Sequence, residues 1–304
     1  MKDIEKLSKW IRLCDVKGIG PSRILKLMHY FGDVDRVYSA SLNELIETRI
    51  FDENGLAEFQ KVINSPDDNL KATLENAMRG GMKIVILNED EYPRKLKFIP
   101  DPPTTLFYYG NYDLVKRKVI AVVGTRQADN KALEFTKKFC RELSEKDIVI
   151  CSGGASGIDT AAHKGALEFS GGKTICVFGT GLDRPYPLEN IPLFEEIKNR
   201  DGLIICEYLP SFQGSPISFV RRNRITSGIA DAVAVMVSGD NGGAVVQTKI
   251  ANQQKRPIFC PKLELELKPN EGVKSALQDY GAIPFGDSSD FLEKLGRSRL
   301  GFDQ

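Results

Sequence analysis

The chain has 304 residues, of which 41% are hydrophobic and 27% are charged, and its formal net charge at pH 7 is +1. This composition is ordinary for a globular protein, and the small net charge excludes an overall basic field, so any nucleic-acid site has to be a local patch. No apolar run approaches the ~20 residues of a transmembrane helix, and residues 1–10 lack the apolar stretch of a signal peptide, so we expect a cytoplasmic protein without a membrane partner.

Residues 1–64 are predicted to form a small all-helical domain, because their apolar residues recur at helical spacing. Gly18, Ile19 and Gly20 lie between two helical stretches and resemble the hairpin of a helix-hairpin-helix (SAM-like) element. Backbone N–H groups at the start of the second helix could bind a phosphate of DNA there, but such a turn is more often only structural, and both interpretations stay open. Residues 65–83 are expected to form a linker helix.

Residues 84–304 are predicted to form a Rossmann-like α/β domain. Near-continuous apolar runs alternate with segments of helical composition, which favours a doubly wound parallel sheet covered by helices on both faces. A proline-rich extended stretch follows the first run, and 130–145 and 243–256 are two of the expected helices. The expected strands are 83–87, 119–123, 148–151, 174–178, 203–208, 232–237 and 257–260.

Glycine-containing loops follow four of these strands, at 124–126, 152–157, 179–183 and 241–244. Glycine lets the backbone approach a ligand, and a following helix presents free N–H groups with a favourable dipole. In a doubly wound sheet, ligands bind at the carboxyl ends of the strands. With Arg126 and the cluster 221–224 (Arg-Arg-Asn-Arg) beside the loops, the sequence predicts an anion site whose guanidinium groups hold phosphate.

The loop pattern argues against the common nucleotide cofactors. The first loop has one glycine followed by Thr125 and Arg126, so it lacks the G-x-G-x-x-G fingerprint of a nicotinamide site, and no Walker A lysine follows any loop. The six cysteines include no C-x-x-C pair, and buried apolar positions suit them better than a disulfide framework or a zinc site. We expect neither a cofactor nor a metal.

Candidate catalytic bases are scarce, because the chain has only two histidines, His29 and His163. No Gly-x-Ser-x-Gly elbow ends a strand. His163 lies one turn into the helix that follows Gly157, and we expect it to pack beneath the glycine loop. Asp159 is expected to cap that helix or to order the loop by accepting backbone N–H groups. We therefore predict no catalytic site.

These segments together resemble the DNA-processing protein A (DprA/Smf) family over about residues 84 to 285. The similar stretches are YPRKLKFIPDPPTTLFYYGN (92–111), VVGTR (122–126), SGGASGIDTAAHKGAL (152–167), GTGLDRPYPLEN (179–190), RNRITSGIAD (222–231) and, loosely, EGVKSALQDYGAIPF (271–285). The chain departs from the family pattern at Asp129, at Gly154 and in NGGAVVQT (241–248), and the C-terminal winged helix of some members is not expected here. The resemblance is that of a divergent member.

The resemblance implies a protein that binds single-stranded DNA through the α/β domain, forms a homodimer, protects incoming DNA and helps to load the RecA recombinase in natural transformation, without catalysis. It implies that the following residues hold phosphate: Gly124, Thr125, Arg126, Ser152, Gly153, Gly157, Arg222, Asn223, Arg224, Gly242 and Gly243. Phe219 is the first candidate for stacking on a base and Tyr186 the second, with core packing as the alternative for both. For Arg222 and Arg224 the alternative is a solvated helix start or a salt bridge to Glu207.

The main alternative is a nucleotide-binding sensor domain. Related α/β domains include LOG-type phosphoribohydrolases, which carry the motif P-G-G-x-G-T-x-x-E. Aligned on Gly242 and Gly243, the catalytic Glu of that motif falls at Lys249, so hydrolysis is disfavoured. A third hypothesis, in which the loops only close turns, does not account for the arginines.

Overall fold

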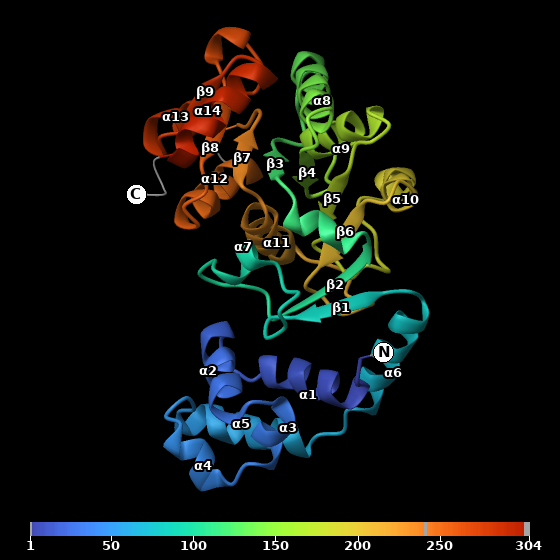
Figure 1. Ribbon diagram of the computed structural model, residues 1–304, viewed down its shortest axis with the longest axis vertical. Coiled ribbons are helices and arrows are strands. Elements are labelled where there is room, and N and C mark those ends of the chain that lie inside the picture. Colours follow the sequence, from blue (N-terminus) through green and yellow to red (C-terminus); the bar gives the residue numbers. More distant parts are fainter. Residues whose placement is uncertain (1, 240–241, 301–304) are drawn as a thin grey trace. The chain divides into compact units, whose positions relative to one another are not determined.

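The structure is a computed structural model that describes residues 2–239 and 242–300 (Figure 1). It divides into two compact units, the first made of Met1–Tyr92 and Asp101–Phe107, the second of Pro93–Pro100 and Tyr108–Gln304. This division differs from the boundary at residue 84 expected from composition, since the first unit also holds a strand. Whether residues 1–64 fold as an independent domain stays a prediction.

The first unit is mainly helical, and its helices begin at recognisable caps. Asp3 caps the first helix by accepting from the N–H groups of Glu5 and Lys6, and Gly18 adopts a φ of 84° in the turn that precedes Pro21. The predicted hairpin between two helices is therefore present. The elements are α1 (Ile4–Cys14), α2 (Pro21–Phe31), α3 (Val34–Ser39), α4 (Leu42–Glu47), α5 (Glu53–Asn64), α6 (Asp68–Arg79) and β1 (Lys83–Ile86).

The segment 101–107 belongs to the first unit because side-chain and backbone groups attach it there. The indole N–H of Trp10, on α1, lies 3.2 Å from both Thr104 O and Thr105 Oγ1. The N–H of Leu87 donates to Thr104 O over 2.9 Å. Trp10 is 1% exposed, so a large apolar surface is buried at this attachment.

The strands form a nine-stranded sheet in the order β1-β2-β6-β5-β4-β3-β7-β8-β9. Strand β3 lies at the centre, with Val119 opposite Val149 of β4 and Ile120 opposite Ala232 of β7, and the pairs from β6 to β9 are parallel. The strands are β2 (Thr105–Gly110), β3 (Val119–Val123), β4 (Val149–Ser152), β5 (Thr174–Val177), β6 (Leu203–Cys206), β7 (Ala232–Val235), β8 (Ile258–Pro261) and β9 (Ile283–Phe285).

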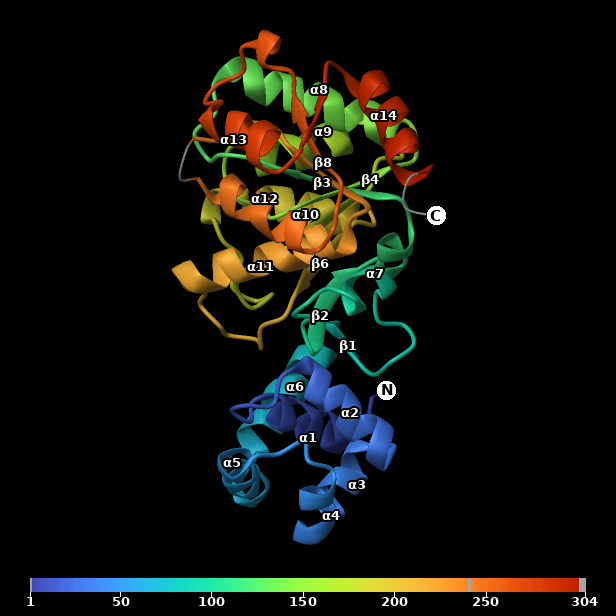
Figure 2. The ribbon, with the colours of Figure 1, turned by 90° about the vertical axis from the view of Figure 1, so that its left-hand side faces the viewer.

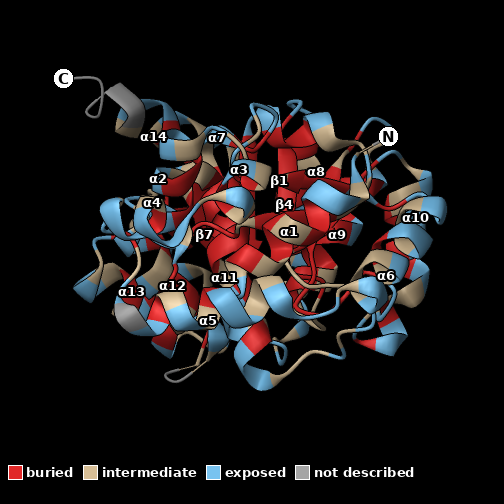
Figure 3. Cartoon of the chain, turned by 90° about the horizontal axis from the view of Figure 1, so that it is seen from below, coloured by how far each residue is buried: buried red, intermediate tan, exposed pale blue. Residues whose placement is uncertain are grey.

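Helices cover both faces of the parallel strands, as the sequence pattern predicts. Figure 2 shows α8, α9 and α14 on one side and α11 and α12 on the other. Strands β4 and β7 between them are buried throughout (Figure 3). The helices of this unit are α7 (Arg94–Lys97), α8 (Asn130–Ser144), α9 (Ile158–Glu168), α10 (Ile191–Asn199), α11 (Pro216–Ile229), α12 (Gly243–Gln253), α13 (Glu271–Asp279) and α14 (Ser288–Leu300), with short 3-10 turns at Tyr112–Lys116, Leu188–Asn190 and Leu263–Leu265.

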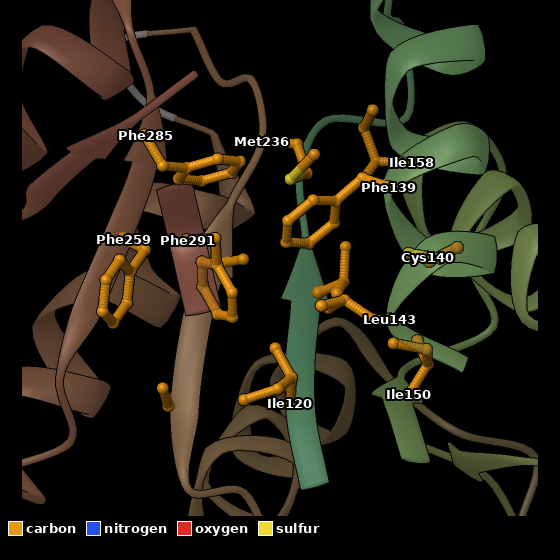
Figure 4. Close-up of a cluster of buried hydrophobic side chains, with 14 of the residues drawn as sticks. Ile120, Phe139, Cys140, Leu143, Ile150, Ile158, Met236, Phe259, Phe285 and Phe291 are labelled. Carbon is orange, nitrogen blue, oxygen red and sulfur yellow. The ribbon is translucent and has the colours of Figure 1, made fainter. Parts of the chain in front are cut away.

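An aromatic cluster fills the core between α8, α14 and the central strands (Figure 4). The ring of Phe139 stacks on Phe285 with centroids 5.0 Å apart and meets Phe291 edge-on at 5.1 Å. Aromatic pairs of this geometry add to the free energy of apolar burial. The core holds the central strands rigidly, and this fixes the loops that leave their carboxyl ends.

Five of the six cysteines are buried, the exception being Cys14, and all six are free thiols. Burial raises the pKa of the Cys151 thiol to about 12, so this thiol is protonated and unreactive at neutral pH. The predicted interpretation of the cysteines near apolar runs as small buried side chains is confirmed. Among the described residues, no helix has both the length and the apolar character that crossing a bilayer requires.

Candidate functional site

An open cleft with a volume of about 800 Å³ lies at the carboxyl ends of β3 and β7. Strands β4, β5 and β6 lie on one side of β3 in the sheet, and β7, β8 and β9 lie on its other side. The strand order therefore reverses between β3 and β7. In α/β sheets, ligands bind at such a switch point, and the cleft lies there. The lining comprises 123–127 after β3, Ala155 and Asp159 after β4, Tyr186, 213–216, Phe219, Val220, Arg222 and Asn223 at the start of α11, and Gly243, Ala244 and Gln247 of α12.

The loop after β3 carries an exposed cation into the cleft. The N–H of Thr125 donates to Val237 O and its carbonyl accepts from the N–H of Ile158, so both neighbouring strand ends hold this loop. Arg126 follows, and its side chain is exposed. Among the described residues no ion pair occupies Arg126, so its guanidinium group is available for an anion.

Arg222 provides a second guanidinium group at the floor of the cleft. Its side chain is only 8% exposed, and Nη1 lies 4.0 Å from Asp159 Oδ2, beyond hydrogen-bond distance. Its Nε is buried without a hydrogen-bond partner in the described part of the chain. A buried cation with so little compensation favours binding of an anion. Arg222 also lines a small adjoining pocket with Arg126, Gly153, Tyr186 and Phe219.

Asp159 orders the glycine loop, as predicted. Its Oδ2 accepts from the N–H groups of Gly153 (3.2 Å) and Ala155 (3.3 Å). Desolvation raises the pKa of this buried carboxyl group, against the opposing effect of Arg222. Because the carboxylate accepts from these two N–H groups, they are not free to bind a phosphate. These two backbone N–H groups therefore bind Asp159, which lies beside Arg222, and do not form a phosphate-binding site themselves.

His163 is a buried residue of α9, as predicted for a side chain that packs in the interior. It is fully buried, and Nδ1 lies 2.7 Å from Thr174 Oγ1. Burial, assisted by the charge of Arg222, lowers the pKa of His163 to about 3. The imidazole is therefore neutral at physiological pH and lies outside the cleft lining.

Two aromatic rings flank the arginines. The centroids of Tyr186 and Phe219 are 5.3 Å apart, and both rings line the cleft. Phe219 packs closely on the backbone, since a Cβ at Gly179 would stand 2.6 Å from its ring. Tyr186 is 50% exposed, so core packing does not describe it. Of the two rings, Tyr186 has more surface open to a ligand.

Arg224 is not among the residues that line the cleft, although the prediction places it in the phosphate site. Its Nη2 donates to Glu207 Oε2 over 2.6 Å, and both side chains are 9% exposed. Residues two apart on a helix point in different directions, so when Arg222 faces the cleft, Arg224 faces away from it. The salt bridge considered as an alternative for Arg224 is the one observed.

Ser152, Gly157 and Gly242 are also absent from the cleft lining. The buried Ser152 hydroxyl donates to Val122 O over 2.7 Å. Gly157 has a φ of 78°, and a Cβ there would stand 2.5 Å from Thr125 O, so it lets two loops pack together. Gly242 precedes α12, and Asn241 in the same predicted loop lies outside the described residues. These three positions are not among the residues that line the cleft, and their predicted contact with phosphate stays a prediction.

The remaining predicted residues do come together. Gly124, Thr125, Arg126, Phe219, Arg222, Asn223 and Gly243 line the cleft, and Gly153 lines the adjoining pocket. Sequence reasoning missed Gln247 and the segment 213–216. Ser215 and Pro216 carry the signal of a helix start, because Ser215 caps α11 and proline takes its first position. No group of three His, Cys, Asp or Glu within residues 2–239 and 242–300 is placed to hold a metal ion.

The chain is similar to known DNA-processing proteins. The sequence model of the family DNA recombination-mediator protein A matches residues 83–296. DNA processing protein DprA of Streptococcus pneumoniae is 38% identical over 246 residues, which cover 80% of this chain and 82% of that protein.

Solved structures show the same likeness in the fold. The crystal structure of DprA from S. pneumoniae superposes with a TM-score of 0.78 at 30% identity, over 96% of this chain and 98% of that one. The structure of DNA processing protein A from Helicobacter pylori, which describes a single-stranded DNA binding mode, superposes with a TM-score of 0.64 at 27% identity. The superposition covers 71% of this chain and 96% of that one.

Proposed function

This chain belongs to the family of DNA recombination-mediator protein A, and we propose that its cleft binds single-stranded DNA without catalysing a reaction. The observation that carries the proposal is the pairing of two guanidinium groups, Arg126 and Arg222, with the rings of Tyr186 and Phe219 along one open cleft. The relative from H. pylori, which has a described single-stranded DNA binding mode, supports it.

The geometry suits an unpaired strand in particular. The two arginines present positive charge to the phosphates, and the first turn of α12, which has no side-chain cap, presents N–H groups. The half-exposed ring of Tyr186 offers a stacking surface, which needs a base that is not paired. Contacts to phosphate carry no base information, so we expect binding with little sequence preference.

The biological role follows from the family resemblance. The bound strand would be protected from degradation, and a homodimer of the protein would pass it to the RecA recombinase during natural transformation. In this proposal the partners are single-stranded DNA, RecA and a second copy of the chain, with no cofactor.

The test is a titration of a fluorescent oligonucleotide at two salt concentrations, with adenosine monophosphate as competitor. Phosphate neutralisation releases counterions, so affinity is expected to fall steeply with salt. Arg126→Ala should weaken binding uniformly across sequences and reduce the salt slope by about one. Lys138→Ala is the matched control, because Lys138 is an exposed cation on α8, away from the cleft lining.

Two results would contradict the proposal. One is an affinity that does not depend on salt, and the other is tighter binding of the mononucleotide than of the oligonucleotide. The second result would favour the nucleotide-sensor alternative. A hydrolytic version of that alternative stays disfavoured, since Lys249 is an exposed residue of α12 outside the cleft lining.

A further inference from the structure

A second hollow, with a volume of about 260 Å³, lies at the amino ends of the central strands, whereas the cleft lies at their carboxyl ends. We call it the Phe98 hollow; its lining is Arg94, Lys95, Phe98, Ile99, Gln254 and Arg256. Lys95 Nζ pairs with Asp231 Oδ2 at 2.5 Å, and the same oxygen accepts from the N–H of Val119. Asp231 precedes β7 and Val119 begins β3, so the hollow lies where these strands begin.

The hollow combines a cation with an exposed aromatic ring. Phe98 is 77% exposed, an unusually high value for a phenylalanine. Arg94 is exposed and forms no ion pair with any residue that the structure describes. A positive charge beside a free ring is the combination with which proteins hold single strands, since the ring stacks on a base of any kind.

The segment that carries Phe98 is closely packed on α11. A Cβ at Gly228 would stand 2.5 Å from Leu96 Cδ1, so α7 packs directly on the backbone of α11 (Figure 1). Arg256 Nη2 donates to both Lys95 O and Gly228 O over 2.9 Å. A preformed surface loses little conformational entropy when a ligand binds.

Two buried polar atoms at the hollow lack partners in the described part of the chain. They are Gln254 Oε1, an acceptor, and Arg256 Nε, a donor. Buried polar groups are normally satisfied, so this pair points to a ligand or to water that offers both a donor and an acceptor. Nucleobase edges offer both, whereas the phosphodiester groups of a strand only accept hydrogen bonds.

Helices α11 and α12 connect the hollow to the cleft. Asn223 lines the cleft and Gly228 contacts the wall of the hollow, five residues or ~8 Å further along α11. On α12, Gln247 lines the cleft and Gln254 lines the hollow, two turns or ~10 Å away on the same face. The two glutamines donate to neighbouring carbonyls of α11, those of Asn223 and Arg224.

We propose that the Phe98 hollow is a second contact for the same single strand, with a base stacked on Phe98 and a phosphate held by Arg94. The strand reaches it from the cleft along α11 and α12. The inference rests on the proposed function, and it goes beyond it by assigning a second site at the amino ends of the central strands. Continuity with the cleft favours nucleic acid over an acidic protein segment as the occupant.

The experiment compares oligothymidylates of about 2 and about 20 nucleotides, because the short one cannot span both the cleft and the hollow, whereas the long one can contact both. Arg94→Glu and Phe98→Ala should each weaken binding of the long oligonucleotide about ten-fold and leave binding of the short one unchanged. Phe98→Trp, which keeps a stacking ring, should retain the affinity. Lys138→Glu is the control for charge reversal. Both Arg94 and Phe98 are exposed, so the variants are expected to fold, and circular dichroism checks this.

The outcomes separate the inference from the proposed function. If the unaltered protein binds the short oligonucleotide but Arg94→Glu and Phe98→Ala bind the long one normally, the inference alone is overturned. If the unaltered protein binds neither oligonucleotide, the proposed function fails and the inference with it. If the variants lose affinity only for a ten-residue polyglutamate peptide used as a second probe, the hollow docks a protein, and the inference is overturned in favour of that occupant.

Discussion

The guanidinium group of Arg222 lies against the α-carbon of Gly153. A Cβ on Gly153 would stand 1.5 Å from Nη1 of Arg222 and 2.0 Å from its Cζ. Any side chain at position 153 therefore takes the place of the guanidinium group. Because Arg222 is only 8% exposed, it has little room to move aside while it keeps its orientation toward the cleft.

We therefore expect Gly153→Ala to act as a DNA-binding mutation. Displacing a charged hydrogen-bonding group should lower the affinity for single-stranded DNA roughly ten- to hundred-fold, similar to Arg222→Ala. The two changes should be strongly non-additive in a double-mutant cycle, since both remove one contact. Fluorescence anisotropy gives the affinities.

A matched glycine provides the control for this cycle. Gly296 on α14 has open space where a Cβ would stand, with no described atom outside its own helical backbone within 4 Å, so Gly296→Ala should leave the affinity unchanged. Additive losses in the Gly153→Ala, Arg222→Ala cycle would show that Gly153 acts on DNA independently of Arg222.

The site could be predicted in outline because its residues follow buried strands. Runs such as 119–123 are apolar at every position, since both faces of the strand are covered, and their carboxyl ends must meet at one edge. Two strands escaped this argument. β2 follows a proline-rich stretch and ends in two half-buried positions and one exposed position, and β9 has three residues with a proline at its centre. Both lie away from the centre of the sheet, where burial gives a weaker pattern.

The errors within the site have a different cause. The motif Arg-Asn-Arg at 222–224 looks like one cluster in the sequence, although alternate residues of a helix cannot share a face. Because this segment is expected to be helical, only one of Arg222 and Arg224 can face the cleft. The contact between Gly153 and Arg222, in contrast, joins loops distant in sequence, and no local pattern indicates it.

Arg224→Ala should destabilise the fold rather than remove a DNA contact. The change would leave the carboxylate of Glu207 buried without its partner, which typically costs about 3–5 kcal/mol of the free energy of unfolding. Urea unfolding followed by far-UV circular dichroism measures this loss. Adding Glu207→Gln should recover part of it, because a neutral amide is less costly to bury than a charge.

The comparison with Arg126→Ala makes this prediction specific. Arg126 is exposed, so Arg126→Ala should leave unfolding unchanged while it lowers DNA affinity. If Arg224→Ala proved as stable as the unaltered protein and bound DNA as weakly as Arg126→Ala, Arg224 would contact the strand after all.

Tyr186→Ala should weaken DNA binding without changing its salt dependence. The half-exposed ring offers stacking to one base, and the loss of one stacked base typically lowers affinity about 5- to 150-fold. No charge is removed, so the slope of log affinity against log salt should match that of the unaltered protein. Anisotropy titrations at several salt concentrations measure both quantities, and Tyr186→Phe should bind normally. A changed slope would indicate that the ring acts on phosphate contacts instead.

His163 makes the stability of the α/β unit depend on pH. Its pKa is lowered from 6.5 to about 3 in the folded protein, mainly by desolvation. Between these values the unfolded chain binds a proton that the folded chain does not, so unfolding is favoured as pH falls. The expected loss is about 1.4 kcal/mol per pH unit below pH ~6.5, or about 2 kcal/mol at pH ~5.

His163→Gln isolates this contribution. Glutamine can still donate to Thr174 Oγ1, which itself donates to Ile150 O, but it does not titrate. Urea unfolding at about pH 7.5 and pH 5 should show a smaller decrease for the variant, by about 2 kcal/mol. The signal should be far-UV circular dichroism, because the single tryptophan, Trp10, lies in the first unit. Equal decreases in both proteins would mean that His163 takes up its proton in the folded state as readily as in the unfolded chain.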